Sequence, residues 1–333
     1  MDSVLHSGAS WPGAVAVSGG ADSVALMLLS ASWTKAKRIA PPVILTVDHG
    51  LRTGSRKDAL SVVRAAKKLG LKAHVLSWKG TKPRADIEAA AREARYRLMG
   101  EWCAVQGVCS LYVAHSLDDQ AETFLLRLAR GSGVDGLSAM QRVSHYPLQG
   151  FDRISVARPL LDFGRADLRA FVSARRQNWV EDPMNLDPRF ARSRLRIAWP
   201  ALTQAGLSAS RIADAARHLG RARHALEWAA DTLLAAGCRF EGGKALLDSG
   251  LLVAAPSEIG LRALASVLMT VSGLAYRPRF ERLERLYGAI TDGPLKAAAT
   301  LHGCRIGPTS KQLAVFGPGT LQIARERSRR LRA

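Results

Sequence analysis

The chain has 333 residues, of which 47% are hydrophobic and 23% are charged, as is typical of soluble globular proteins. This length allows two domains with sizeable cores. No apolar run approaches the ~20 residues that a membrane-spanning helix needs, and the N-terminus lacks the basic start and apolar stretch of a secretory signal. We therefore expect a cytoplasmic protein without a membrane partner.

The formal net charge is +20, and arginine outnumbers lysine. Such an excess favours a polyanionic partner, nucleic acid ahead of a membrane surface, although an arginine- and alanine-rich chain also fits a G·C-rich genome. Arginine suits bidentate phosphate contacts and base stacking. The four cysteines form no Cys-x-x-Cys pair, which argues against a zinc ribbon or an iron–sulfur cluster.

A glycine-rich segment, Ser18-Gly-Gly-Ala-Asp-Ser23, lies between the first predicted strand, residues 13–17, and a helix-like run from Val24. Such a turn directs backbone N–H groups and the positive end of a helix toward one point. Glycine leaves room for a phosphate, and Asp22 supplies a carboxylate for Mg²⁺. The segment predicts a nucleotide site, with a purely structural turn as the alternative. It resembles the pyrophosphate loop of ATP pyrophosphatases.

Short apolar runs alternate with amphipathic segments through the first 180 or so residues. The further strands are predicted at 43–48, 73–78, 111–115 and 154–157, and the helices between them at 55–69, 87–105 and 119–128. This alternation predicts a parallel sheet of about five strands with helices on both faces. Ligands bind such sheets at the carboxyl ends of the strands, so residues 18–23, 48–49 and 115–119 should share one edge.

Two polar motifs follow the second and fourth predicted strands. In Val47-Asp-His-Gly-Leu-Arg52, Asp48 is a candidate contact for ribose or base and Arg52 for phosphate, a weak signal alone. His115-Ser-Leu-Asp-Asp-Gln-Ala-Glu122 concentrates three carboxylates, which suits Mg²⁺ or a cationic amine. Asp118 is also placed to cap the helix, and His115 fits either an acid–base group or a hydrogen-bonded structural histidine. Beside an ATP-type loop, we favour a functional site for the whole block.

Two arginine-containing segments come next. Arg130-Gly-Ser-Gly133 fits a phosphate-binding loop and equally a glycine cap at a helix end. The segment 178–183, Asn-Trp-Val-Glu-Asp-Pro, precedes four closely spaced arginines, namely Arg189, Arg192, Arg194 and Arg196. Arginines beside aromatic residues fit RNA backbone contacts and base stacking, and we favour RNA binding over a solvated surface helix.

A second region begins near residue 200. Helices are predicted at 208–236, with a break considered at Leu219–Gly220, and at 257–272 and 278–290, followed by a hairpin of strands at 303–306 and 312–316 and by a basic tail at 325–332. We therefore expect an α/β catalytic domain over residues 1–200 and a smaller, mainly helical, basic domain over residues 201–333. The family resemblance described next implies that this second domain binds tRNA.

Taken together, the motifs resemble the tRNA(Ile)-lysidine synthases of the PP-loop ATP pyrophosphatase superfamily. They occur in that family's order, at residues 18–23, 47–52, 89–96, 118–123, 130–133, 158–161 and 179–183. Two positions depart from the family's usual pattern, with Ser116 in place of a second histidine and Ser193 in place of asparagine. The chain is similar to the compact members, which lack an extra terminal domain.

The resemblance implies a Rossmann-like fold and a ligase that forms a carbon–nitrogen bond. ATP adenylates the wobble cytidine in the CAU anticodon of tRNA(Ile) and releases pyrophosphate. L-Lysine then displaces AMP to give lysidine, which changes codon and amino-acid specificity from Met to Ile. Another adenylating tRNA-modifying enzyme of the same fold, such as a thiolase, is the nearest alternative. A non-catalytic RNA-binding protein that retains the nucleotide fold is the alternative from a different class.

The resemblance also implies residue roles. The catalytic candidates are Asp22, Asp118, Asp119 and Glu122, with Asp22 as the Mg²⁺ ligand. The ATP-binding candidates are Ser18, Gly19, Gly20, Ala21, Asp22, Ser23, Asp48 and Arg52. The candidates for tRNA or lysine are His115, Arg95, Arg130, Arg189, Arg192, Arg194 and Arg196. A second copy of the chain, forming a homodimer, is a further candidate partner.

Overall fold

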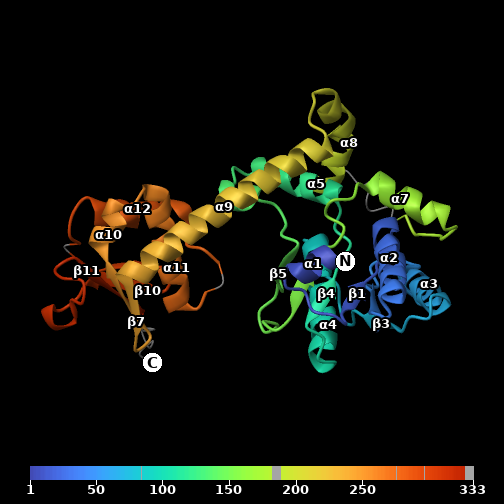
Figure 1. Cartoon of the computed structure of the whole chain (residues 1–333), viewed down its shortest axis with the longest axis horizontal. Helices are drawn as coiled ribbons and strands as arrows, with labels where there is room; N and C mark the ends of the chain where they lie inside the picture. The colour runs from blue at the N-terminus through green and yellow to red at the C-terminus, as the bar shows by residue number, and fades with distance from the viewer. Residues whose placement is uncertain (84, 182–188, 275, 296, 327–333) are drawn as a thin grey trace. The chain divides into compact units, whose positions relative to one another are not determined.

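The chain divides into two compact units, Met1–Gly220 and Arg221–Ala333, in the computed structural model (Figure 1). The structure describes all residues except 84, 182–188, 275, 296 and 327–333. Part of the 179–183 motif and most of the basic tail therefore lie outside the described residues. The boundary between the units falls inside one helix, α9 (Ala209–Gly237). The functional division after residue 200 stays a prediction.

The first unit is built on a six-stranded sheet in the order β3-β2-β1-β4-β6-β5. The strands are β1 (Ala14–Ala16), β2 (Val43–Asp48), β3 (Ala73–Ser77), β4 (Ser110–Tyr112), β5 (Val143–His145) and β6 (Ser155–Ala157). All neighbours are parallel except β5 and β6. The predicted parallel sheet is confirmed. The edge strand β5 was not predicted, because its three residues contain no apolar run.

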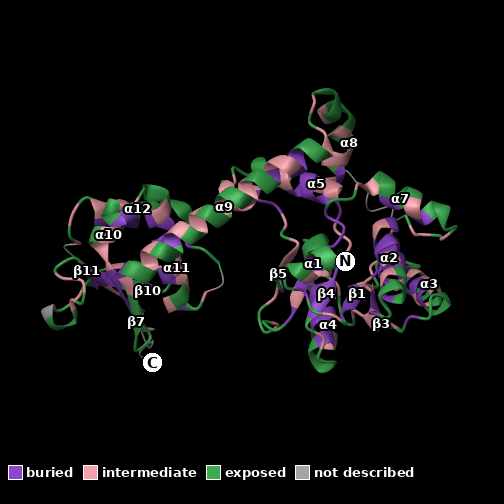
Figure 2. Cartoon of the chain, viewed as in Figure 1, coloured by how far each residue is buried: buried purple, intermediate pink, exposed green. Residues whose placement is uncertain are grey.

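Helices cover both faces of this sheet (Figure 1), as the alternating pattern predicted. The helices that pack on the sheet are α1 (Asp2–His6), α2 (Ala21–Lys37), α3 (Ser55–Lys68), α4 (Ile87–Val105) and α7 (Arg165–Ala174). The unit also contains α5 (Leu117–Leu128), which packs with α6 (Val134–Leu137) and α8 (Ala191–Gln204). Successive strand side chains point to opposite faces. Val15 and Ile44 accordingly pack with α2, α3 and α7, whereas Ala14 and Leu45 pack with α4. The inner strands β1, β2, β4 and β6 contain the buried residues of the sheet, which are purple in Figure 2, whereas the edge strands β3 and β5 are partly exposed.

The order of the strands determines where a ligand can bind. The chain passes from β1 to β2 on one side and returns to β4 on the other side of β1. The helix that follows β1, α2, packs on one face of the sheet, and the helix that leads into β4, α4, packs on the other. Sheets of this kind bind ligands where the order reverses, at the carboxyl ends of these two neighbouring strands. The two strongest sequence motifs follow these two strands.

The second unit contains a five-stranded antiparallel sheet in the order β7-β8-β11-β10-β9. Its elements are the end of α9, then β7 (Cys238–Glu241), β8 (Lys244–Asp248), α10 (Ser249–Ala254), α11 (Ser257–Ser272), α12 (Phe280–Thr291), β9 (Ala299–Leu301), β10 (Cys304–Pro308), a 3-10 turn (Lys311–Leu313) and β11 (Thr320–Arg325). Apolar residues of the sheet, such as Leu247 and Ile306, pack with Leu264 and Leu268 of α11. Helix α9 runs unbroken through Leu219–Gly220.

The predicted hairpin is partly wrong. Its first strand corresponds to β10, but the partner of β10 is β11 at 320–325, and residues 311–313 form the 3-10 turn. Leu313 and Val315 are exposed, whereas Leu321 and Ile323 are buried. The alternation that buries one face of a strand therefore begins after Gly319. No helix in the described parts of the chain is long and apolar enough to cross a membrane.

Candidate active site

Residues 18–23, which we call the nucleotide loop, follow β1 and are held in one shape by hydrogen bonds. Gly19 has φ +93°, a left-handed conformation that favours glycine. The Ser23 hydroxyl donates to the Gly20 carbonyl at 2.8 Å and accepts from the Ser18 amide at 3.2 Å. The Gly19 carbonyl accepts from the Val180 amide at 2.9 Å. These bonds hold the loop at the N-terminus of α2, where backbone amides favour an anion.

Asp22, in the first turn of α2, combines an ion pair with an unsatisfied oxygen. Its Oδ2 lies 3.4 Å from Arg165 Nε. Its Oδ1 is buried and has no hydrogen-bond partner among the described residues. Burial raises the pKa of Asp22, and Arg165 only partly opposes this rise. A carboxylate oxygen buried without a partner is costly unless a ligand completes it.

Asp119 is held by the start of α5. The Ser116 amide and hydroxyl both donate to Asp119 Oδ2, at 2.9 and 3.1 Å, and form a capping box. Burial alone would raise the pKa of Asp119, but Arg165, His115 and the Ser116 hydrogen bonds outweigh it and lower the pKa. Asp119 is therefore a buried carboxylate that stays ionised.

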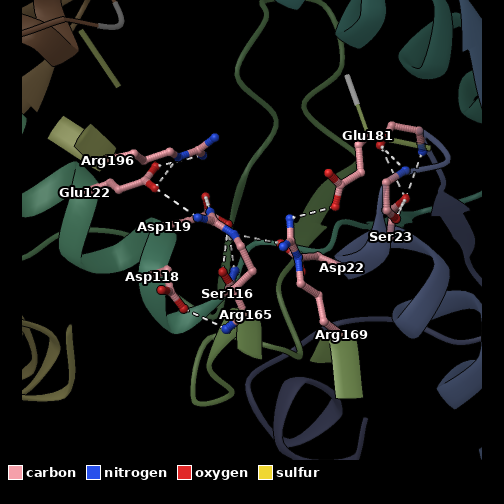
Figure 3. Close-up of polar contacts among 12 residues, drawn as sticks. Asp22, Ser23, Ser116, Asp118, Asp119, Glu122, Arg165, Arg169, Glu181 and Arg196 are labelled. Carbon is pink, nitrogen blue, oxygen red and sulfur yellow. Dashed lines mark hydrogen bonds and ion pairs between the residues drawn. The ribbon is translucent and has the colours of Figure 1, made fainter. Parts of the chain in front are cut away.

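Arg165, at the start of α7, joins the two motifs (Figure 3). Besides its contact with Asp22, its guanidinium lies 3.2 Å from Asp119 Oδ1 and 3.2 Å from Glu122 Oε1. These carboxylates outweigh the effect of burial and raise the pKa of Arg165. One cation therefore bridges the loop after β1 and the helix after β4, as the topology predicted for this edge.

Sequence reasoning missed Arg165. It lies outside the motifs, in a helix that was not predicted. The available signal was the spacing of Leu168 and Val172, both buried on one face of α7. An arginine in the first turn of a helix lies near the positive end of the helix dipole, which is unfavourable for a cation. Such a residue is therefore expected to be paired with carboxylates.

Asp119 and Glu122, both on α5, form what we call the carboxylate cluster. Glu122 is the more buried of the two, with a side chain that is 2% exposed. Arg196 of α8 binds both of its oxygens, through Nε at 2.6 Å and Nη2 at 3.1 Å (Figure 3). This two-pronged pairing is the strongest geometry for arginine and a carboxylate. Arg196, one of the four arginines predicted at 189–196, therefore forms an ion pair with Glu122.

Asp118 has a different partner. Its Oδ2 accepts from the Arg165 backbone amide at 2.7 Å, so it caps α7. The cap of α5 itself is Ser116. The interpretation that Asp118 caps its own helix, α5, is therefore wrong, because Ser116 has that position and Asp118 binds the first amide of α7.

Asp48 and Arg52 lie at the carboxyl end of β2, beside the loop after β1. Asp48 Oδ1 accepts from the Ser55 hydroxyl and from the Gly50 amide. Arg52 pairs with Asp58 at 2.6 Å. Both side chains therefore help to fold the start of α3, and their roles toward ATP stay predictions.

His115 lies at the end of β4 with Nδ1 buried and unpaired within the described chain. Burial, which Asp119 opposes and Arg158, Arg92 and Arg192 reinforce, lowers its pKa to about 3. The imidazole is therefore neutral at physiological pH. The remaining predicted arginines are exposed or half-buried, namely Arg95, Arg130, Arg189, Arg192 and Arg194.

Comparison with known proteins identifies the family. A family model described as a PP-loop domain matches residues 9–201. The chain is 41% identical over 334 aligned residues to a tRNA(Ile)-lysidine synthase of Methylobacterium nodulans, across 99% of this chain and 95% of that protein. It is 40% identical over 311 residues to one of Wolbachia pipientis wMel, across 91% and 70%. The chain belongs to the tRNA(Ile)-lysidine synthase family.

A solved structure is also similar. A U34-tRNA thiolase from Methanococcus maripaludis matches with a TM-score of 0.51 and 16% identity, over 62% of this chain and 72% of that one. At this identity the likeness shows the shared fold alone. For a lysidine synthase family member, the capping role of Ser116 gives a physical use to a position where the family often has histidine.

Proposed function

We propose that this ligase of the lysidine synthase family performs both half-reactions at the carboxyl ends of β1 and β4. One observation carries the proposal. The guanidinium of Arg165 lies within 3.4 Å of Asp22 in the nucleotide loop and 3.2 Å from Asp119 and Glu122 in the carboxylate cluster. Residues suited to ATP and residues suited to a cationic amine therefore meet at one side chain.

In the first half-reaction, residues 18–23 hold the phosphates of ATP, with ribose or base toward Asp48. The 2-oxygen of the wobble cytidine attacks the α-phosphorus, the bond to the β-phosphate breaks, and pyrophosphate leaves. Mg²⁺ fits Asp22, because Oδ1 is a hard oxygen that lacks a partner in the described chain. When bound, the ion neutralises charge that develops on the phosphates.

A single protein carboxylate is enough for such an ion. Within the described residues, no group of three or more His, Cys, Asp or Glu side chains is arranged to hold a metal. Mg²⁺ commonly takes one or two carboxylates and completes its shell with substrate phosphates and water. The proposed site therefore forms fully only with ATP present.

In the second half-reaction, Asp119 and Glu122 hold the ε-ammonium group of L-lysine. The ammonium loses a proton to water, the resulting neutral amine attacks carbon 2 of the activated base, the bond to the 2-oxygen breaks, and AMP leaves. The lowered pKa of Asp119 favours holding an ammonium over removing its proton. Arg165 and Arg196 keep the two carboxylates ionised and in place.

The RNA partner is tRNA(Ile) with a CAU anticodon, and the expected location is the cytoplasm. The net charge of +20 and the exposed or half-buried Arg130, Arg189, Arg192 and Arg194 support contacts with its phosphates. A homodimer remains a candidate assembly. The four cysteines are free, two of them buried, which gives no support to a thiolase that works through clustered cysteines.

The first test measures pyrophosphate release by purified protein, omitting Mg²⁺, L-lysine or bacterial tRNA in turn. We expect release that needs tRNA, together with radiolabelled lysine fixed to the RNA. Release with tRNA but without lysine incorporation would move the assignment to another base modification. No turnover under any condition would support the binding-only alternative.

A second test addresses the carboxylates. Asp119→Asn and Glu122→Gln should raise KM for lysine at least tenfold while changing KM for ATP less than threefold, because each substitution removes a charge that attracts the ammonium. Glu101→Gln, an exposed position on α4, is the matched control. Equal losses for both ligands would indicate a metal or structural role instead.

A further inference from the structure

A cavity of about 530 Å³ lies at the carboxyl end of β3, away from the carboxylate cluster. It is bounded by the segment after β3 and by one face of the first half of α4. Its principal lining residues are Ser77, Trp78, Lys79, Ala90, Ala94 and Arg97. None of these residues has a part in the function proposed above.

The cavity combines one aromatic ring with small side chains. Ala90 and Ala94 are four residues apart, so they lie one above the other on the same face of α4. Their small side chains and the indole of Trp78 line the same cavity. A heterocycle that enters this space stacks on an aromatic ring, the arrangement by which proteins hold unpaired bases.

The rim is positively charged. Lys82 Nζ lies 4.1 Å from the centre of the Trp78 ring and donates to the Trp78 carbonyl. Lys79 is exposed, and Arg97 pairs with Glu93 at 2.6 Å across one turn of α4. Three cations beside one carboxylate suit a ligand that carries phosphates next to its ring.

The cavity also belongs to the catalytic edge of the sheet. The Trp78 amide donates to the Asp48 carbonyl at 2.9 Å, which ties the segment to the end of β2. Neighbouring strands are about 4.8 Å apart, so β3 and β1 are separated by about 10 Å. Arg92, on the same helix as Ala90 and Ala94, lies close enough to His115 to act on it electrostatically. The first half of α4 therefore adjoins both the cavity and the catalytic edge.

We propose that this cavity binds the base of a nucleotide next to the modified cytidine, stacked on Trp78, while the cations at the rim contact the RNA backbone. The proposal rests on the function proposed above. The adenine of ATP is the other heterocycle present, but the end of β2, with Asp48 and Arg52, lies between the phosphate loop and the cavity. We have assigned the ribose or base of ATP to that strand end, near Asp48.

The first experiment fills or empties the cavity. Ala94→Leu closes it with a good helix former, and Trp78→Ala removes the stacking surface. Each should raise KM for tRNA about tenfold to a hundredfold, the range for losing one stacked base. KM for ATP and for lysine should change less than threefold. Ala104→Leu, at an exposed position near the end of α4, is the matched control and should behave as the unsubstituted protein.

The second experiment tests which base enters. Transcripts of tRNA(Ile) with an abasic nucleotide on either side of the wobble cytidine are assayed with the unsubstituted protein and with Ala94→Leu. If the proposal holds, one abasic substitution raises KM in the unsubstituted protein but has no further effect in the variant. Independent, multiplicative losses would overturn it, as would a rise in KM for ATP rather than for tRNA. Because both arms require lysine transfer by the unsubstituted protein, failure of the proposed function is seen separately.

Discussion

The nucleotide loop and the carboxylate cluster follow neighbouring strands, β1 and β4, yet they differ in whether their buried carboxylate oxygens have partners. In the loop, Asp22 keeps one buried oxygen without a partner in the described chain. In the cluster, Asp119 and Glu122 are paired with arginines from α7 and α8. The loop is thus incomplete without a ligand, whereas the cluster already contains its own cations.

This difference indicates how each half binds. An unsatisfied buried oxygen costs about 1–3 kcal/mol, which a ligand recovers on binding. A paired carboxylate gives no such gain, and an incoming ammonium has to share or replace an arginine contact. We therefore expect the two halves to respond differently to substitution.

The largest effect on activity should come from a substitution in the nucleotide loop. Asp22→Ala should lower pyrophosphate release about 100- to 1,000-fold, the range for removing a preorganised electrostatic contact to the reacting group. Binding of tRNA, measured by filter retention, should remain within threefold, because Asp22 is a half-buried residue of the loop that is proposed to hold ATP. Normal pyrophosphate release by this variant would sink the assignment of the loop.

Arg165→Ala tests the carboxylate cluster, whose side chains are already paired with arginines. It leaves Asp22, Asp119 and Glu122 without their shared cation, so the free energy of unfolding should fall by about 3 kcal/mol. Arg165→Lys should recover part of this loss, since it retains the charge but not the fork that reaches three carboxylates. In that variant, KM for lysine should rise more than KM for ATP. A change confined to stability would limit Arg165 to a structural role.

Substituting one carboxylate in each half compares them directly. In buffer with EDTA, Asp119→Asn should lower the free energy of unfolding by about 2 kcal/mol, because it breaks a hydrogen-bonded ion pair. Asp22→Asn should leave it unchanged or raise it by about 1 kcal/mol, because it removes a buried charge with an unsatisfied oxygen. Urea unfolding of both variants measures the difference. Equal destabilisation would contradict the contrast between the two halves.

The smallest effect concerns His115. Its pKa falls from 6.5 to about 3 on folding, so the folded protein binds fewer protons than the unfolded chain between these values. Stability should therefore decline as the pH falls below 6.5, by about 1–2 kcal/mol at pH 5. His115→Gln should show a smaller decline between pH 7 and pH 5 in urea unfolding. An unchanged pH dependence would show that His115 is not the group responsible.

The sequence predicted the parts of the fold that periodicity defines. Helix α4 and strand β2 have the predicted bounds, because a long amphipathic pattern and a β-branched apolar run are each unambiguous. The strand expected at 312–316 was wrong, since a short apolar run matches a turn as well as a strand. The four-residue helix α6 and the three-residue strand β5 are too short to carry a pattern.

The candidate site was only half accessible from the sequence. Motifs revealed the loop and the carboxylates, because those residues are consecutive. The bridging contact of Arg165 joins residues 143 positions apart, and no local pattern reports such a distance. The same holds for Arg196, which was expected to contact RNA and whose described partner is Glu122. Roles toward substrates stay predictions for both.

The hydrogen bond from the Val180 amide to the Gly19 carbonyl affects the orientation of the next peptide group in the nucleotide loop. The Gly19 carbonyl and the Gly20 amide belong to one peptide unit, which is planar and trans, so the two groups point in opposite directions. By holding the carbonyl at 2.9 Å, Val180 helps to fix the direction of the Gly20 amide, which donates to the Ser18 hydroxyl at 3.5 Å. Hydrogen bonds in such a chain also polarise one another. Val180, some 160 positions downstream in the sequence, therefore helps to set the orientation of the Gly20 amide, a donor that it does not contact.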